Sequence, residues 1–255
     1  MTPVTIGLLG FAAGLVAGWV NVVAGGGTLL SMPVLALSGL PPMAANATSR
    51  MGVLSQSLSA TIVWHRQRAI PWPLALRLLP VAALGTVAGA FGAALMQNEH
   101  AGQVLALVFG ALALLTTADA LGWIPAPPAA SGPQTEAEAG PATLALFGAI
   151  SLYGGAVQAG VGLLYAYAAY RLGALTPAQA NAVKSLLTLV FSAGALAVFV
   201  SRGLVDFWVG LPLALGSLIG GHLGATFANR LPARGFKLAI AAAALVTALR
   251  FGGLI

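Results

Sequence analysis

No charged side chain occurs in this chain before Arg50. Only 6% of the residues are charged and 59% are hydrophobic, whereas soluble domains carry about 25% charged residues. So few charges cannot cover a surface that faces water, and the sequence therefore predicts an all-α polytopic membrane protein. The start of the chain lacks a basic segment and its apolar run continues well beyond residue 20, so we expect no cleaved signal peptide.

The apolar runs predict helices that are broken in two places. A spanning helix needs about 20 apolar residues, and this length predicts helices at 4–23, 46–64, 75–96, 102–121, 142–159, 181–200, 207–228 and 236–254. Two shorter apolar pieces, 28–39 and 163–174, reach only about halfway across a membrane at about 1.5 Å per residue. The polar, proline-rich stretch 122–141 is the predicted linker between a first repeat, 1–121, and a second, 142–255.

One pattern of glycine, proline and asparagine occurs in both halves at a constant offset. In the first half it comprises Gly25, Gly26, Gly27, Pro42 and Asn46. In the second half it comprises Gly160, Gly162, Pro177 and Asn181. The shared pattern indicates an internal duplication, and glycine-broken segments at matching places in two apolar halves are typical of a transport site.

Basic residues favour inverted over parallel repeats. They cluster at Arg66, Arg68 and Arg77 and again at Arg230, Arg234 and Lys237. Inverted halves place both clusters on the cytoplasmic side and leave only Arg202 outside, in agreement with the positive-inside rule. Inversion requires an odd number of crossings per half, so each short piece either spans or pairs with the preceding helix as a re-entrant hairpin. If the short piece alone is re-entrant, the repeats are parallel.

The two glycine clusters have two possible roles. Gly25, Gly26 and Gly27, like Gly160 and Gly162, disfavour helix continuation by about 1 kcal/mol each relative to Ala. The broken backbone can bind a substrate, because unpaired backbone groups are tolerated in a membrane only beside protein or a water-filled cavity. The alternative is close helix packing by small residues, which is the better interpretation for Gly85, Gly89, Gly216 and Gly220.

Polar side chains follow each glycine cluster at the predicted start of a helix. They are Asn46, Thr48, Ser49 and Arg50 in the first half, and Asn181, Lys184 and Ser185 in the second. A helix N-terminus carries partial positive charge, so two such starts with one cation each predict a binding site for an anion. The alternative is that Arg50 and Lys184 extend to the membrane interface and help to set the topology.

A few other polar residues have open roles. Asn21 and Gln158 precede the glycine clusters and either face the same cavity or hold helices together. Asp119 and His222 are candidates for proton coupling, although His222 also fits a buried structural role. The sequence contains no metal-ligand cluster and no enzyme or ATP-binding signature, so we expect no metal, no cofactor, no nucleic-acid partner and no catalysis. Glycine-rich faces permit a homodimer.

The stretch from Gly14 to Arg50 resembles the first signature of the TauE/SafE (sulfite exporter) family of permeases. The resemblance rests on the glycine cluster, Pro33, the run Gly39-Leu40-Pro41-Pro42 and the run from Ala45 to Arg50. Ser49 and Arg50 replace the family's Asn and Lys, and Val161 replaces a glycine in the more degenerate second half.

This resemblance implies a multi-pass carrier of the bacterial inner membrane that binds small sulfur-containing anions. Sulfite, organosulfonates or sulfoacetate would be the substrates, and the protein would export them by alternating access. The alternatives are a channel-like or metal-ion permease and a membrane subunit that anchors a partner without transporting anything.

Overall fold

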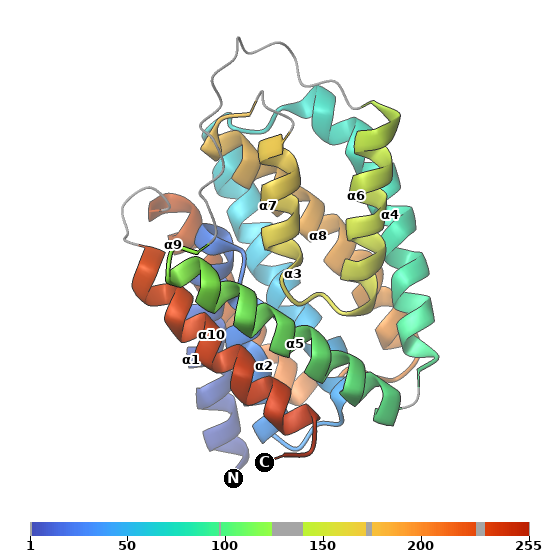
Figure 1. The fold of residues 1–255 in the computed structure, drawn as a ribbon, viewed down its shortest axis with the longest axis vertical. Helices are drawn as coiled ribbons and strands as arrows, with labels where there is room; N and C mark the ends of the chain where they lie inside the picture. Colours follow the sequence, from blue (N-terminus) through green and yellow to red (C-terminus); the bar gives the residue numbers. More distant parts are fainter. Residues whose placement is uncertain (1, 97, 124–139, 172–174, 228–232, 255) are drawn as a thin grey trace.

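The computed structural model describes residues 2–96, 98–123, 140–171, 175–227 and 233–254 (Figure 1). These ranges contain ten helices and no strands, which confirms the all-α prediction. The first half holds α1 (Pro3–Ala24), α2 (Gly27–Leu37), α3 (Pro42–Arg66), α4 (Trp72–Ala94) and α5 (Asn98–Ala120). The second half holds α6 (Pro141–Ala156), α7 (Val161–Arg171), α8 (Pro177–Ser201), α9 (Phe207–Phe227) and α10 (Ala233–Phe251).

Five of these helices, α1, α4, α5, α8 and α9, are long and apolar enough to cross a membrane. Large apolar side chains project outward from the bundle, and Leu84, Leu107 and Leu114 are 74–75% exposed. An outward-facing surface of this kind suits lipid rather than water. Polar side chains are instead buried along α3, where Ser49, Gln56 and other polar groups face protein.

Each glycine cluster breaks a helix, as the sequence predicts. α1 ends at Ala24 and α2 starts at Gly27, while α6 ends at Ala156 and α7 starts at Val161. α2 folds back along α1 so closely that a Cβ atom on Gly27 would lie 2.0 Å from the Ala17 carbonyl oxygen. Figure 1 shows a loop that joins the lower ends of α6 and α7 and reverses the chain, so that α7 runs back toward the end from which α6 came. Each broken helix is therefore a hairpin that returns toward the side from which it started.

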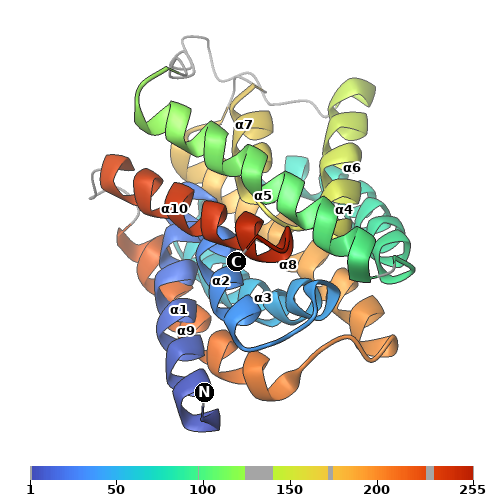
Figure 2. The same ribbon diagram turned by 60° about the horizontal axis from the view of Figure 1, so that its bottom comes forward.

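The helix packing has the same pattern in both halves. α1 packs against α9 as α6 packs against α4, and α3 packs against α9 as α8 packs against α4. α3 also packs against its counterpart α8, and α5 against its counterpart α10, so that α5 and α10 lie side by side in both views (Figures 1 and 2). The orientation of the two repeats in a membrane stays a prediction.

Small residues bring the paired helices close together. A Cβ atom on Gly89 of α4 would lie 1.9 Å from the Leu152 carbonyl oxygen of α6. A Cβ atom on Gly220 of α9 would lie 2.0 Å from the Leu15 carbonyl oxygen of α1. These glycines therefore serve close helix packing, the interpretation favoured from their spacing.

Two helices start one turn earlier than predicted. α3 begins at Pro42 and α8 at Pro177, because proline suits the first position of a helix and Thr176 forms a capping box with Gln179 before α8. Asn46 and Asn181 consequently lie in the second turn and not at a helix start. Most of the predicted linker 122–141 falls outside the described residues, so its assignment, and with it the division into repeats, stays a prediction.

Candidate functional site

Arg50 is completely buried in α3 and binds the end of α6 in the other half. Its Nη1 donates to the Gly154 carbonyl oxygen over 2.7 Å and its Nη2 to the Gly155 oxygen over 2.9 Å. The guanidinium carbon lies 5.9 Å and 5.4 Å from the ring centroids of Phe191 and Phe199, a cation–π arrangement. Arg50 is therefore held on three sides, and its charge faces the negative end of the α6 dipole.

Lys184 in α8 makes the reciprocal contact with the first half. Its Nζ donates to the carbonyl oxygens of Asn21 (3.2 Å) and Val22 (2.8 Å) in the last turn of α1. Lys184 is only 3% exposed. Each half thus contributes one buried cation that binds the C-terminal carbonyl groups of the broken helix in the other half.

The two chain breaks touch each other between these cations. A Cβ atom on Gly25 would lie 2.8 Å from the carbonyl carbon of Gly162, and one on Gly162 would lie 2.9 Å from the Gly25 oxygen. We call the region around Gly25 and Gly162 the central contact. Gly25 also has φ +80°, in the left-handed region that favours glycine. No larger residue fits this crossing without displacing backbone.

The helix N-termini near the central contact are those of α2 and α7. Gly26 is the N-cap of α2, and α7 starts at Val161. The prediction that helices start at Asn46 and Asn181 is wrong, because α3 and α8 start one turn earlier, at Pro42 and Pro177. Two N-terminal dipole ends still meet in the centre of the protein, but they come from the short helices.

Asn46 completes the contacts at the end of α6. Its Nδ2 donates to the Ala156 carbonyl oxygen over 2.8 Å, so that Arg50 and Asn46 together satisfy carbonyl groups that a helix end leaves unpaired. The other amide atom, Oδ1, is buried and has no hydrogen-bond partner in the part of the chain that the structure describes.

The neighbouring hydroxyl groups have structural partners. Ser49 Oγ donates to the Asn46 carbonyl oxygen over 2.7 Å. Thr48 Oγ1 accepts from the Asp206 backbone N–H over 3.0 Å, just before α9. Ser49 therefore uses its O–H within α3, whereas Thr48 acts as an acceptor that links α3 to the start of α9.

Gln158 lies in the loop between α6 and α7 with an unusual backbone and an unsatisfied amide. It is 3% exposed and has φ +65°, a conformation that costs a non-glycine residue about 1–3 kcal/mol. Among the described residues, neither its Oε1 nor its Nε2 has a hydrogen-bond partner. Buried polar groups are nearly always paired, so this amide is exceptional.

The break between α1 and α2, the first break, has a paired amide side chain, unlike the second break between α6 and α7. Asn21 Oδ1 accepts from the Gly27 N–H over 3.2 Å, which caps the start of α2. Asn21 is thus a structural residue, whereas the sequence left its role open. The second break is held by the Tyr153 hydroxyl, which donates to the Ala159 carbonyl oxygen over 2.6 Å.

The remaining predicted residues lie in less defined positions. Ser185 is buried next to Lys184, while Asn181 is partly buried one turn earlier in α8. His222 is exposed on α9, so it is no buried core histidine, and Asp119 is half-buried in the last turn of α5. No group of three or more His, Cys, Asp or Glu side chains that could hold a metal ion occurs within the described ranges.

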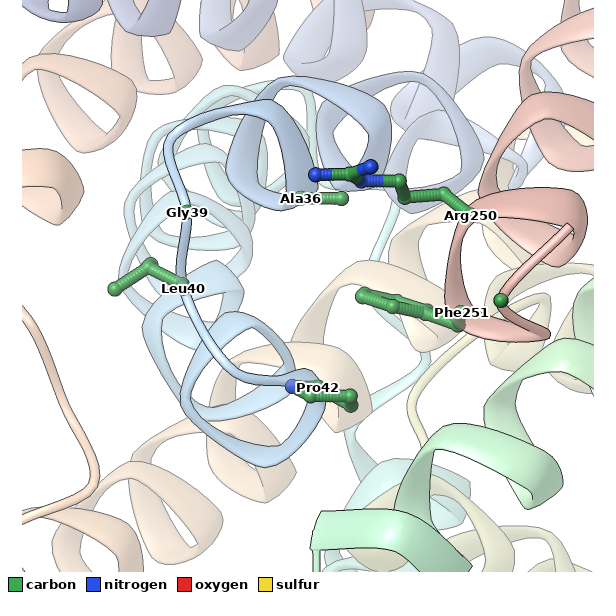
Figure 3. Close-up of a pocket in the computed structure, with 7 residues that line it drawn as sticks. Ala36, Gly39, Leu40, Pro42, Arg250 and Phe251 are labelled. Carbon is green, nitrogen blue, oxygen red and sulfur yellow. The ribbon is translucent and has the colours of Figure 1, made fainter. Parts of the chain in front are cut away.

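Sequence reasoning missed Phe191 and Phe199, since their contacts with Arg50 depend on the crossing of the two halves. It also missed an open cavity of about 260 Å³ at the outer end of α2, near Gly39 and Arg250. Figure 3 shows the Arg250 side chain reaching over Ala36 at this cavity. Arg50, Lys184 and Gln158 do not line it, so the cavity is separate from the central contact.

Comparison with known proteins gives a family and several relatives. A family model described as Sulfite exporter TauE/SafE matches residues 10–251. The "Probable membrane transporter protein ORF9" of Sinorhizobium sp is 26% identical over 242 residues, which cover 94% of this chain and 90% of that protein.

Two further relatives have similar names. The "Probable membrane transporter protein YfcA" of Escherichia coli (strain K12) is 26% identical over 225 residues, covering 88% of this chain and 81% of the relative. A "Probable membrane transporter protein" of Haemophilus influenzae is 25% identical over 224 residues, which cover 84% of this chain and 82% of that protein. No solved structure matches the chain at a significant level.

Proposed function

The chain belongs to the TauE/SafE sulfite exporter family, and from this membership and the geometry we propose that it exports small sulfur-containing anions by alternating access. Its relatives are named membrane transporters, and the family match and the apolar helices identify it as a multi-pass bacterial membrane transporter rather than an enzyme. The substrate, its charge and the direction of transport are the parts that we propose.

The observation that supports an anionic substrate is the pair of buried cations beside the central contact. Arg50 is 0% and Lys184 3% exposed, and both bind backbone carbonyl groups. Carbonyl dipoles offset only part of the cost of removing a full charge from water. A bound anion would supply the missing charge, and ionisable groups inside a membrane protein typically mark such a site. The same two charges oppose a metal ion, which argues against a metal-ion permease.

The binding groups follow from this arrangement. Arg50 and Lys184 would provide charge, while Asn46 and Gln158 would contact the anion through their amides. Backbone N–H groups would come from Gly26, Gly160 and Gly162, since those of Gly25 and Gly27 are already bonded to Asn21. Thr48 and Ser49 would orient α3, and Asn181 and Ser185 would form the corresponding part of α8.

The arrangement of the helices supports inverted repeats and alternating access. In Figure 1, α3 runs upward and its counterpart α8 downward, and the hairpin α1–α2 enters from the opposite end to the hairpin α6–α7. A hairpin that returns to its own side does not cross the membrane. The three remaining helices of each half, α3 to α5 and α8 to α10, then make an odd number of crossings. Two opposed hairpins that meet at one site are the arrangement expected of a carrier whose halves rock around a fixed site.

The test uses purified protein in liposomes that contain labelled sulfite or sulfoacetate. We expect Arg50→Gln and Lys184→Gln to reduce efflux about 10- to 100-fold, the effect of one lost charged contact. Arg77→Gln removes an exposed cation and serves as the matched control. Because Arg50 and Lys184 also hold helix ends, folding is checked by size-exclusion chromatography and by the unfolding temperature without anion. A folded variant with undiminished efflux would refute the site.

Binding and coupling are measured separately. Sulfite, sulfoacetate and chloride are compared for their effect on the unfolding temperature, because a ligand that binds the folded state stabilises it. Asp119→Asn and His222→Gln test proton coupling, and the proposal that these residues couple transport to protons fails if both variants keep the pH dependence of efflux.

A further inference from the structure

The two breaks are equivalent in the repeat but differ in what their side chains leave unpaired. At the first break, the amide oxygen of Asn21 is paired with the Gly27 N–H. At the second break, both amide atoms of Gln158 lack a partner among the residues described. The unpaired polar groups therefore gather on one side of the central contact, although the repeat alone would suggest two equal sites.

Two further unpaired atoms lie against the same segment. Asn46 and Arg50, one turn apart on α3, bind the carbonyl groups of residues 154–156 directly before Gln158. Asn46 Oδ1 and Arg50 Nε are both buried and, within the described part of the chain, without a partner. Three buried side chains from two elements thus present unused hydrogen-bonding atoms at the α6–α7 break.

The chemistry of these atoms is mixed. Arg50 Nε–H can only donate. Asn46 uses its Nδ2 as a donor to Ala156, which fixes Oδ1 as an acceptor. Gln158 supplies one acceptor and one donor group in either orientation of its amide. A ligand that fits must accept from Arg50 and donate to Asn46 or Gln158.

We propose that the transported anion binds at the α6–α7 break, between Arg50, Asn46 and Gln158, and that these residues select a monoanion that carries its own hydrogen-bond donor. Hydrogen sulfite and hydroxy-substituted sulfonates belong to this class, whereas sulfate, sulfoacetate and alkyl sulfonates only accept. An acceptor-only anion leaves Asn46 Oδ1 unpaired in a buried site, and leaving a buried group unpaired is costly. This inference rests on the proposed function, since it names the substrate class of the same site.

Sulfamate and methanesulfonate form a matched pair of probes. Both are small monoanions with one SO₃ group, and they differ in an NH₂ group in place of a CH₃ group. Isothermal titration calorimetry of the purified full-length protein is expected to show about tenfold tighter binding of sulfamate, the effect of one well-placed hydrogen bond. Gln158→Leu should lower this ratio, because it removes one of the two acceptors, the other being Asn46 Oδ1, while methanesulfonate still binds.

Gln56→Leu is the control for Gln158→Leu. Gln56 is another buried glutamine with an amide nitrogen that has no partner among the described residues, but its backbone packs against Gly221 of α9, away from the central contact. This variant should keep the wild-type ratio. If Gln158→Leu does not fold, Gln158→Met replaces it, and the wild-type ratio alone already decides whether the site selects a donor.

The outcomes separate this inference from the proposed function. Equal binding of the two probes by the wild type, or an unchanged ratio in Gln158→Leu, overturns the inference and leaves anion transport in place. Absence of binding for both probes, together with sulfite, overturns the proposed function and the inference with it.

Discussion

Replacing Gly89 by Ala is expected to push α4 away from α6. The added Cβ atom would lie 1.9 Å from the Leu152 carbonyl oxygen and 2.9 Å from its carbonyl carbon. The first distance is well below van der Waals contact, and the obstacle is backbone, which cannot rotate aside. The helices must therefore separate by more than 1 Å, roughly the shortfall from a contact of about 3.5 Å. Overpacking of this kind typically costs about 1–3 kcal/mol.

Gly92, one turn further along α4, offers a control within the same helix. A Cβ atom there would meet nothing within 4 Å, so Gly92→Ala should gain about 1 kcal/mol from helix propensity. The two variants should then differ by about 2–4 kcal/mol, or roughly 5–15 °C in unfolding temperature for a chain of this size. Thermal unfolding in one detergent measures the difference. Unfolding temperatures within about 2 °C of each other would refute the close approach of α4 and α6.

Three further predictions use the same measurement. Gly220→Ala should destabilise the protein about as much as Gly89→Ala, because its Cβ atom would lie 2.0 Å from the Leu15 oxygen; a neutral effect would contradict the equivalence of the α1–α9 and α6–α4 contacts. Asn21→Ala removes the cap of Gly27 and should cost about 0.5–2 kcal/mol, and an unchanged unfolding temperature would speak against that cap. Thr176→Val removes the capping box before α8 and should cost about 1 kcal/mol without changing efflux; a transport defect in the folded variant would show that the start of α8 has a further role.

The helices were predictable because the apolar runs and the helix-breaking residues indicate the same boundaries along this chain. The glycines at 25–27 and around 160–162 disfavour helix continuation, and the structure breaks both helices there. The apolar pattern alone predicts the starts of α3 and α8 one turn too late, because it does not include the preference of proline for the first helical position. Asn46 is therefore predicted at the start of the helix, whereas it lies in the second turn of α3.

The cations were predictable as residues but their partners were not. A buried charge in a membrane chain is recognisable from its rarity, and Arg50 and Lys184 stand out for that reason. Their partners are carbonyl groups more than 100 positions away in the sequence. Backbone carbonyls carry no sequence signal, so only the crossing of the two halves reveals which helix end each cation binds.

The two cationic contacts are similar in role but not copies of each other. In the alignment of the repeats, Lys184 matches Ser49 and Arg50 matches Ser185, so the cations differ by one position. Arg50 uses two nitrogens for two carbonyl groups, whereas Lys184 uses one nitrogen for two. The planar guanidinium leaves Nε without a partner among the described residues, whereas the Lys184 ammonium group has three N–H donors for its two carbonyl acceptors. The one-position difference between the halves thus gives the two breaks different donor geometries, which is consistent with the single site that we propose at the α6–α7 break.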